Sequence, residues 1–185
     1  MNPDFLARAQ KIASDLMAGI TSEQLELSTP CAKWNVGELI EHMIGAQYWA
    51  LGGVTGSEPA GTGEGAAGGD YSAGFAEAAA AATTAFGEEG ALERTVNLGF
   101  GDIPATALLE LIITDTFTHA WDLANATGQD TNLDPQMAAA VLEASRQSIQ
   151  PAFRSETGDV FGLEQPAPDG SNAMTQLAAF LGRNV

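Results

Sequence analysis

The sequence predicts an all-α protein, a four-helix bundle with additional short helical and irregular segments at its C-terminal end. Apolar residues recur at helical spacing nearly throughout the 185 residues. No stretch of the chain alternates apolar and polar residues as a strand does. Residues that begin and end helices flank the same periodic stretches. We therefore expect long helices that bury their apolar faces against one another.

The first half of the chain predicts two helices and a loop. Residues 3–19 form the first helix, with Asn2 as its cap. The second helix starts at Asn35, and Glu38, three residues on, completes a capping-box pattern. Residues 52–69 hold eight glycines, so we expect a flexible loop there.

The second half continues the helical pattern. Gly128 stands where a helix-ending glycine is usual, after the longest periodic stretch. We expect residues 1–150 to form the bundle and residues 151–185 to form an irregular tail with a short helix packed on the same domain. The expected elements are an alanine-rich helix over 72–86, an extended excursion over 90–104, and helices over 105–127, from 134–135 to before 151, and over 173–181.

Charge and composition limit the function classes. Seven Lys plus Arg stand against 24 Asp plus Glu, a net charge of −17. Such a surface repels phosphate backbones and anionic headgroups, which disfavours nucleic-acid and membrane partners. The single cysteine allows no intrachain disulfide, and no signal-peptide pattern or long apolar run is present. We expect a cytoplasmic protein, and the sequence leaves a monomer and a homodimer open.

Asp115 and His119 interrupt an apolar face of the fourth predicted helix. They are four residues apart, so their side chains lie one above the other. Burying a carboxylate costs several kcal/mol unless it is paired or coordinated. No Lys or Arg occurs between Arg94 and Arg146, so a partner must come from elsewhere in the chain. A bound metal would neutralise the carboxylate, and oxygen plus imidazole suits zinc and related ions.

His42 interrupts the apolar face of the second helix in the same way, and it is the other of the two histidines. If the second and fourth helices are neighbours, His42 can converge with Asp115 and His119. Three protein ligands plus water is the pattern of an open, catalytic type of metal site. The alternative is a pair of core histidines that hydrogen-bond to their neighbours.

Two further carboxylates can support these groups. Asp122, three residues after His119, can accept a hydrogen bond from its ring, or it can be a solvated carboxylate near a helix end. Glu38 lies one turn before His42 and can support that ring, although capping is the commoner use of a glutamate there.

The large aromatic residues and the cysteine are candidates for the wall of a pocket. Trp34, Trp49 and Trp121 are core or pocket-wall residues by type. Cys31 lies just before a helix N-terminus, where a thiol can become more acidic, but a small packed cysteine is the better interpretation. No Ser–His–Asp order or paired-glutamate site is present, so the sequence assigns no catalytic residue.

Two motifs resemble those of a known family. Ser-Thr-Pro-Cys-Ala-Lys-Trp-Asn-Val-Gly-Glu-Leu-Ile-Glu-His (28–42) and Asp-Thr-Phe-Thr-His-Ala-Trp-Asp-Leu-Ala-Asn-Ala-Thr-Gly (115–128) resemble the two metal motifs of the DinB-like, mycothiol-dependent maleylpyruvate isomerase superfamily. The ending Leu-Ala-Ala-Phe-Leu-Gly-Arg (177–183) is similar to that of a mostly actinobacterial subgroup.

The resemblance implies a DinB-like four-helix bundle that binds one divalent metal ion, often zinc or nickel. By motif position the ligands are His42, Asp115 and His119. It also implies that a small-molecule thiol such as mycothiol is activated at the metal and attacks an electrophilic substrate. Two departures from the isomerase matter: it has a glutamate where this chain has Asp115, and the stretch after Gly128 is too short for its C-terminal domain.

Three functions therefore stay open. The first is a metal-dependent thiol S-transferase or isomerase, and the second is a non-catalytic metal-binding or interaction module. The third is a metal-dependent hydrolase, in which metal-bound water is the nucleophile. An open metal position beside a deep pocket favours an enzyme, and a base near the metal-bound water favours the hydrolase.

Overall fold

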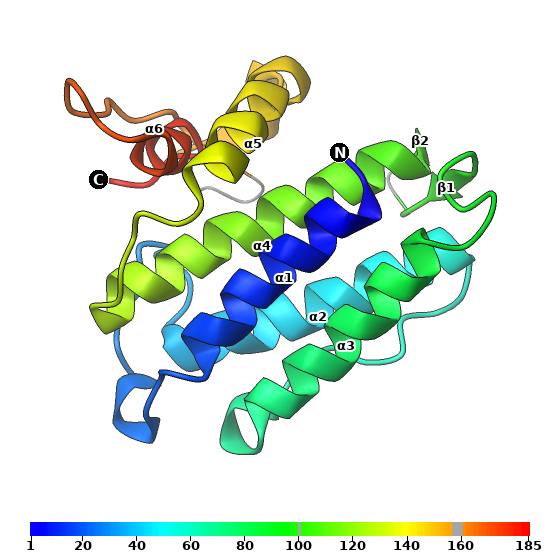
Figure 1. Ribbon diagram of the computed structural model, residues 1–185, viewed down its shortest axis with the longest axis horizontal. Helices are drawn as coiled ribbons and strands as arrows, with labels where there is room; N and C mark the ends of the chain where they lie inside the picture. The colour runs from blue at the N-terminus through cyan, green and yellow to red at the C-terminus, as the bar shows by residue number, and fades with distance from the viewer. Residues whose placement is uncertain (100, 157–160) are drawn as a thin grey trace.

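The body of the protein is a bundle of four helices. The computed structural model describes residues 1–99, 101–156 and 161–185. The first two helices, α1 and α2, each contact both α3 and α4, so the four form a closed ring (Figure 1). This arrangement confirms the predicted helical bundle and the expected contact between the second and fourth helices. The helices are α1 (Pro3–Met17), α2 (Val36–Thr55), α3 (Tyr71–Phe86) and α4 (Ala105–Thr127).

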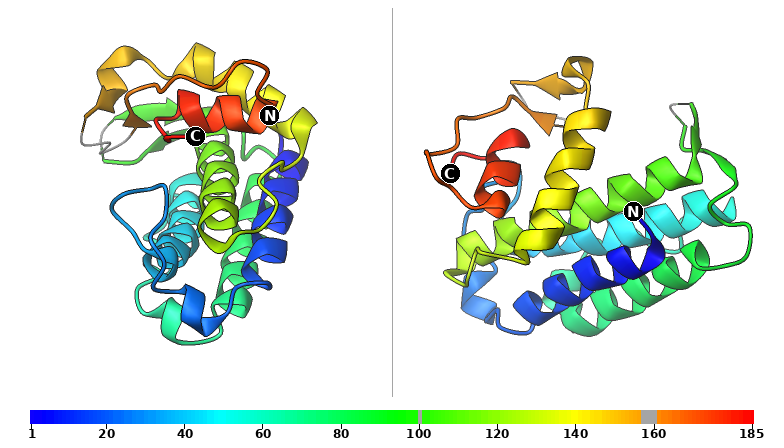
Figure 2. Two further views of the ribbon diagram at one scale, coloured as in Figure 1. Left: turned by 90° about the vertical axis from the view of Figure 1, so that its left-hand side faces the viewer. Right: turned by 45° about the horizontal axis from the view of Figure 1, so that its top comes forward.

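Two shorter helices lie on one side of this bundle. Helices α5 (Pro135–Ser148) and α6 (Ala173–Phe180) pack against each other, and both contact α4 (Figure 2). No helix in the described part of the chain is long and apolar enough to cross a membrane. The 3₁₀ turns are η1 (Ser22–Gln24), η2 (Ala66–Gly68) and η3 (Pro151–Phe153).

Four very short strands accompany the helices. β1 (Thr95–Asn97) pairs antiparallel with β2 (Asp102–Pro104), which confirms the extended excursion expected over residues 90–104. The strands β3 (Arg154–Ser155) and β4 (Phe161–Gly162) pair in parallel within the segment expected to be irregular. No periodicity predicts a strand of two residues, so this pair could not be read from the sequence.

Side-chain caps fix where the helices start. Asn35 Oδ1 accepts a hydrogen bond from the Glu38 amide at 2.8 Å, and the Glu38 carboxylate accepts one from the Asn35 amide at 2.9 Å. This capping box starts α2 where the sequence predicts it. The predicted start of α3 at Ser72 is one residue late, because Asp70 is its cap and accepts from the Ala73 amide. The first helix ends at Met17, before the predicted Gly19.

A buried polar network sets the register of the bundle. Gln47 of α2 is fully buried and accepts a hydrogen bond from Gln10 of α1 at 2.9 Å. Its own amide donates to the Thr116 hydroxyl of α4, also at 2.9 Å. Because each of these polar groups is buried, a shift of one helix along another would leave one of them unpaired. The network therefore fixes α2 against α4 near His42 and Asp115.

The glycine-rich segment is a loop with one 3₁₀ turn beyond Thr55, and part of it packs against α2. Residues 52–55 still belong to α2, so the predicted loop starts too early. Beyond them the chain folds back along α2, and the Ala67 amide donates to the Glu41 carboxylate at 3.3 Å. A Cβ on Gly63 would collide with the Glu41 carbonyl oxygen, and one on Gly45 would collide with that of Thr62. Glycine thus permits the backbone of this segment to touch α2.

Two glycines allow this close approach to be tested. Gly63 and Gly65 both have a left-handed φ, of 76° and 78°, but an added Cβ on Gly65 meets nothing within 4 Å. Gly65→Ala should cost about 1 kcal/mol, from backbone strain alone. Gly63→Ala should cost about 1–3 kcal/mol more, because it also overpacks the contact with α2. Urea unfolding of both variants measures the difference, and equal costs would mean that the segment does not pack on α2.

Candidate metal centre

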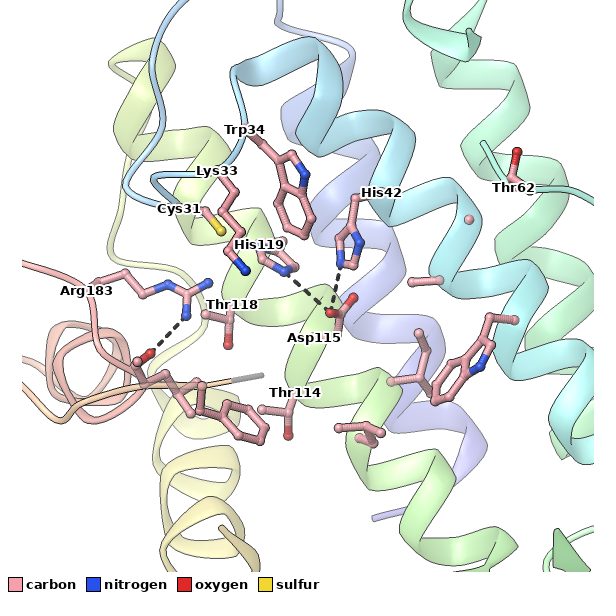
Figure 3. Close-up of a pocket in the computed structure, with 18 of the residues that line it drawn as sticks. Cys31, Lys33, Trp34, His42, Thr62, Thr114, Asp115, Thr118, His119 and Arg183 are labelled. Carbon is pink, nitrogen blue, oxygen red and sulfur yellow. Dashed lines mark hydrogen bonds and ion pairs between the residues drawn. The ribbon is translucent and has the colours of Figure 1, made fainter. Parts of the chain in front are cut away.

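Three side chains of the kinds that bind metal ions meet between α2 and α4. His42 comes from α2, and Asp115 and His119 come from α4 (Figure 3). Asp115 Oδ1 lies 3.1 Å from His42 Nε2 and 3.4 Å from His119 Nε2. One donor atom from each residue lies within 4.8 Å of the other two. The structure thus brings together the three residues that the sequence singled out.

Packing holds the two imidazoles at a large angle to each other. The Trp34 ring stacks on His42 with 4.2 Å between centroids and 22° between planes. The rings of His42 and His119 are 4.9 Å apart and 80° from parallel. Trp34 also meets His119 edge-on at 5.8 Å. The Trp34 indole therefore restricts the rotation of both imidazole rings, whose Nε2 atoms face Asp115.

Asp115 is the most constrained group of the three. Its side chain is 23% exposed, yet Oδ2 is buried and has no hydrogen-bond partner among the residues that the structure describes. Burial would raise the pKa of this carboxyl, but His119 and His42 outweigh burial and hold the pKa well below its usual range. Oδ1 contacts both imidazoles, and Oδ2 is left as a buried acceptor that no described residue satisfies.

The other nitrogen of His119 is bound to a second carboxylate. His119 Nδ1 donates to Asp122 Oδ2 at 2.9 Å, and Asp122 is fully buried. Asp122 is therefore not the solvated carboxylate that the sequence left open. Burial opposes the charged form of His119, but Asp115 and Asp122 outweigh it and raise the pKa of His119 to about 9. The bond to Nδ1 leaves Nε2 as the nitrogen that can bind a metal.

Arg183, from the C-terminal end of the chain, supplies the cation for Asp122. Its Nη2 and Nε atoms lie 2.7 and 3.2 Å from the two oxygens of Asp122. Burial would raise the pKa of the Asp122 carboxyl, but Arg183 and His119 hold that pKa below its ordinary value. The arginine that enters this site thus pairs with Asp122 and leaves Asp115 to the histidines.

A pocket of about 610 Å³ opens onto these residues. Trp34 and Trp49 line it, together with the apolar side chains of Leu111 and Ile112. Trp121 instead packs in the core and is 3% exposed, so only its core interpretation fits. Glu38 is exposed and caps α2, which is the alternative that the sequence favoured over support of His42.

Cys31 also lines the pocket, but as a protonated thiol. It is partly buried, and burial raises the pKa of the thiol despite the opposing effect of Arg183. The acidic thiol considered for a helix N-terminus is therefore not favoured. Donor atoms of Cys31, His119 and Asp122 also lie within 4.8 Å of one another. This second set is a poorer metal site, because Asp122 already pairs with Arg183.

Two parts of the pocket were missed by reasoning from the sequence. One is the backbone around Pro59, Gly61 and Thr62, and nothing in its composition indicates a pocket wall. The other is Arg183, whose only signal was its place at the end of the 177–183 motif. Lys33 lines the pocket as well. Two of the seven basic residues therefore border the pocket, whereas Asp115 is the one acidic residue that does so in the described part of the chain.

Comparison with known proteins places the chain in a family. Two proteins from two strains of Mycobacterium tuberculosis, each described as uncharacterized, are 39% identical to it over 182 residues. The aligned region covers 96% of this chain and 95% of each relative. No solved structure matches the chain. The model of the mycothiol maleylpyruvate isomerase N-terminal domain matches residues 6–124, which include His42, Asp115 and His119. The chain therefore belongs to the mycothiol maleylpyruvate isomerase N-terminal domain family.

Proposed function

We propose that this protein binds one divalent metal ion, zinc or nickel, through His42, Asp115 and His119, and activates a small thiol there as an S-transferase or isomerase. One observation carries the proposal: these three side chains converge and line an open pocket, with Asp115 Oδ2 buried and without a partner in the described part of the chain. Membership of a mycothiol-related family supports the choice of a thiol.

The residues fit a metal ion by their chemistry. Two imidazole nitrogens and one carboxylate oxygen suit zinc and nickel, and three protein ligands leave a position for a further ligand. Asp122 supports the fit, because metal-binding histidines usually donate their other N–H to a carboxylate. A metal ion near these nitrogens would also neutralise the Asp115 carboxylate, whose Oδ2 has no partner among the described residues.

A bound divalent metal lowers the pKa of a thiol, which makes thiolate available at neutral pH. The chain's own residues hold and enclose the reactants. Trp34 fixes His42 by stacking, and Asp122 fixes His119 by its hydrogen bond. Trp49, Leu111 and Ile112 line the pocket with apolar surface, which limits water beside the reacting sulfur. Lys33 and Arg183 also line the pocket, and Arg183 is paired with Asp122.

The pocket helps to rank the alternatives. Its volume of about 610 Å³ falls in the usual range for small-molecule sites, which favours an enzyme over a closed metal-binding module. A hydrolase needs a general base beside the metal-bound water. No glutamate lines the described part of this pocket, and its one carboxylate, Asp115, is the proposed ligand. We therefore favour thiol chemistry over hydrolysis.

Two measurements test the proposal. Elemental analysis of protein incubated with zinc or nickel and then desalted should find about one metal ion per chain. Calorimetry should then show mycothiol binding to the metal-loaded protein, and no comparable binding of S-methyl mycothiol, which cannot ionise at sulfur. No retained metal would refute the metal site. Equal binding of the thiol and the thioether would refute thiol activation but leave the metal site standing.

Zinc affinity should rise with pH. The pKa of His119 is about 9 in the metal-free protein, against an ordinary value of 6.5, so its ring carries a proton at pH 7. A metal binds the neutral imidazole, so below pH 9 binding must release this proton. Apparent affinity should increase about tenfold per pH unit from 7 to 9 and then level off.

The metal-free protein should show the opposite trend. Because the pKa of His119 is raised on folding, its contribution to stability is complete below pH 6.5 and is lost as the pH rises through about 9. Chelator competition measures the zinc affinity, and thermal melts measure the stability. A zinc affinity that does not change between pH 7 and 9 would show that zinc binding releases no proton from His119 in this range, which would contradict the raised pKa.

A further inference from the structure

We infer that Arg183 is a positioning residue for the metal centre, because it fixes Asp122 and, through Asp122, the imidazole of His119. The inference rests on the proposed function, since it takes His119 as a ligand. Arg183 lies outside the region that the family model matches, which ends at residue 124. The C-terminal tail thus supplies a part of the site that the four-helix bundle lacks.

The contacts form a continuous chain from the tail to the site. Arg183 binds both oxygens of Asp122, at 2.7 and 3.2 Å, and such a two-point contact fixes the plane of a carboxylate. Asp122 Oδ2 in turn accepts from His119 Nδ1 at 2.9 Å. Asp122 is fully buried, so water does not take over either contact. The direction of His119 Nε2 therefore depends on where Arg183 holds the carboxylate.

The tail is shaped to return Arg183 to α4. Just after α6, Gly182 has a φ of 94°, and a Cβ there would lie 2.6 Å from the Gly162 Cα of β4. Arg154 Nη1 donates to the carbonyl oxygens of Gly162 and Phe180 at 2.9 and 2.7 Å, which ties β4 to the end of α6. The Arg183 guanidinium also donates to the Leu181 carbonyl at 3.0 Å (Figure 3).

The same tail forms one wall of the pocket. Phe161, Gly162 and Leu181 line it together with Arg183. The segment that carries Arg183 to Asp122 therefore also borders the pocket beside His119. A purely structural anchor could end on any surface group, whereas this one ends on the carboxylate that holds a proposed ligand.

Zinc affinity of Arg183 variants tests the inference. Arg183→Met should weaken zinc binding by about tenfold or more, the usual effect of removing outer support from a metal-binding histidine. Arg183→Lys, which keeps the charge but offers a single contact point, should bind with intermediate affinity. Arg146→Met is the matched control: it removes an exposed arginine of α5 beside the same α6 and should bind zinc as wild type does.

A double-mutant cycle tests the route through Asp122. If Arg183 acts through Asp122, Arg183→Met should cause little further loss of zinc affinity in an Asp122→Asn background. Losses that multiply would refute the route. The Nδ1 proton of His119 offers a second readout, and spectra of histidine-labelled protein contain only two imidazoles. In Arg183→Met this proton should exchange faster and shift upfield, while the His42 signals stay in place.

The failures are distinguishable. Wild-type protein that binds no metal refutes the proposed function. Wild-type protein that binds zinc, together with a folded Arg183→Met variant of equal affinity, refutes only the role of Arg183. If circular dichroism shows that Arg183→Met does not fold, Arg183→Lys decides: an affinity between wild type and a tenfold loss supports the inference, and wild-type affinity overturns it.

Discussion

Replacing His42 or His119 with alanine is expected to weaken zinc binding so far that zinc no longer stabilises the protein strongly. Loss of outer support for a metal ligand costs about 10–100-fold in affinity, so loss of a ligand itself should cost more than about 100-fold. At a zinc concentration 1,000 times Kd, wild-type protein should gain about 4 kcal/mol of stability. In a domain of this size that is a rise in Tm of roughly 8–16 °C. Neither His42→Ala nor His119→Ala should show this rise.

A pocket residue outside the ligand set provides the control. Thr114 lines the same pocket from α4, next to Asp115, and its hydroxyl donates to the Glu110 carbonyl oxygen. Thr114→Ala should keep the full zinc-induced rise in Tm. The two histidine variants should differ in the metal-free state, because His42 is 29% exposed whereas His119 is 8% exposed and bound to Asp122. A zinc response that survives in either histidine variant removes that residue from the site.

The helices could be predicted because local signals mark both their interiors and their ends. The fourth helix was predicted over residues 105–127 and spans Ala105–Thr127, since Pro104 precedes it and Gly128 ends it with a φ of 72°. The errors fall where tertiary contact decides. The glycine-rich segment reads as a flexible loop by composition, yet its backbone packs on α2 through the contact of Gly63 with Glu41. Composition shows that a close approach is allowed but not where it happens.

The site could be predicted in part, for a similar reason. Asp115 and His119 share a helix face by spacing alone, and His42 joins them once α2 and α4 are neighbours. A polar residue on an apolar helix face can be recognised in the sequence. The pairing of Arg183 with Asp122 cannot, because the two residues are 61 positions apart and meet only after the tail has folded back. Contacts between distant segments leave no periodic trace.

The two carboxylates that flank His119 should differ in how their replacement changes the response to zinc. Asp115 faces the pocket between two imidazoles, and its Oδ2 has no partner among the described residues. Asp115→Asn should therefore remove most of the zinc-induced rise in Tm. It should also lower the metal-free Tm, because His119 and His42 attract the Asp115 carboxylate by more than its burial costs. The measurement is a pair of thermal melts, with and without zinc.

Asp122→Asn should destabilise the protein both with and without zinc. It breaks the buried pair with Arg183 and leaves the guanidinium without a carboxylate, which costs about 3–5 kcal/mol. In a chain of this length that is a fall in Tm of roughly 6–20 °C. Glu38→Gln serves as the control for loss of a carboxylate, because glutamine can still complete the capping box of α2.

The pair of variants separates a ligand from a structural acid without any assay of activity. If Asp115→Asn loses similar stability with and without zinc and still binds zinc as wild type does, Asp115 is structural and the ligand set is wrong. Asp122 would then be the remaining carboxylate beside His119, in the set that includes Cys31. That outcome requires Arg183 to release Asp122, so zinc binding would then be stronger in Arg183→Met than in wild type, the reverse of the result expected for a positioning residue.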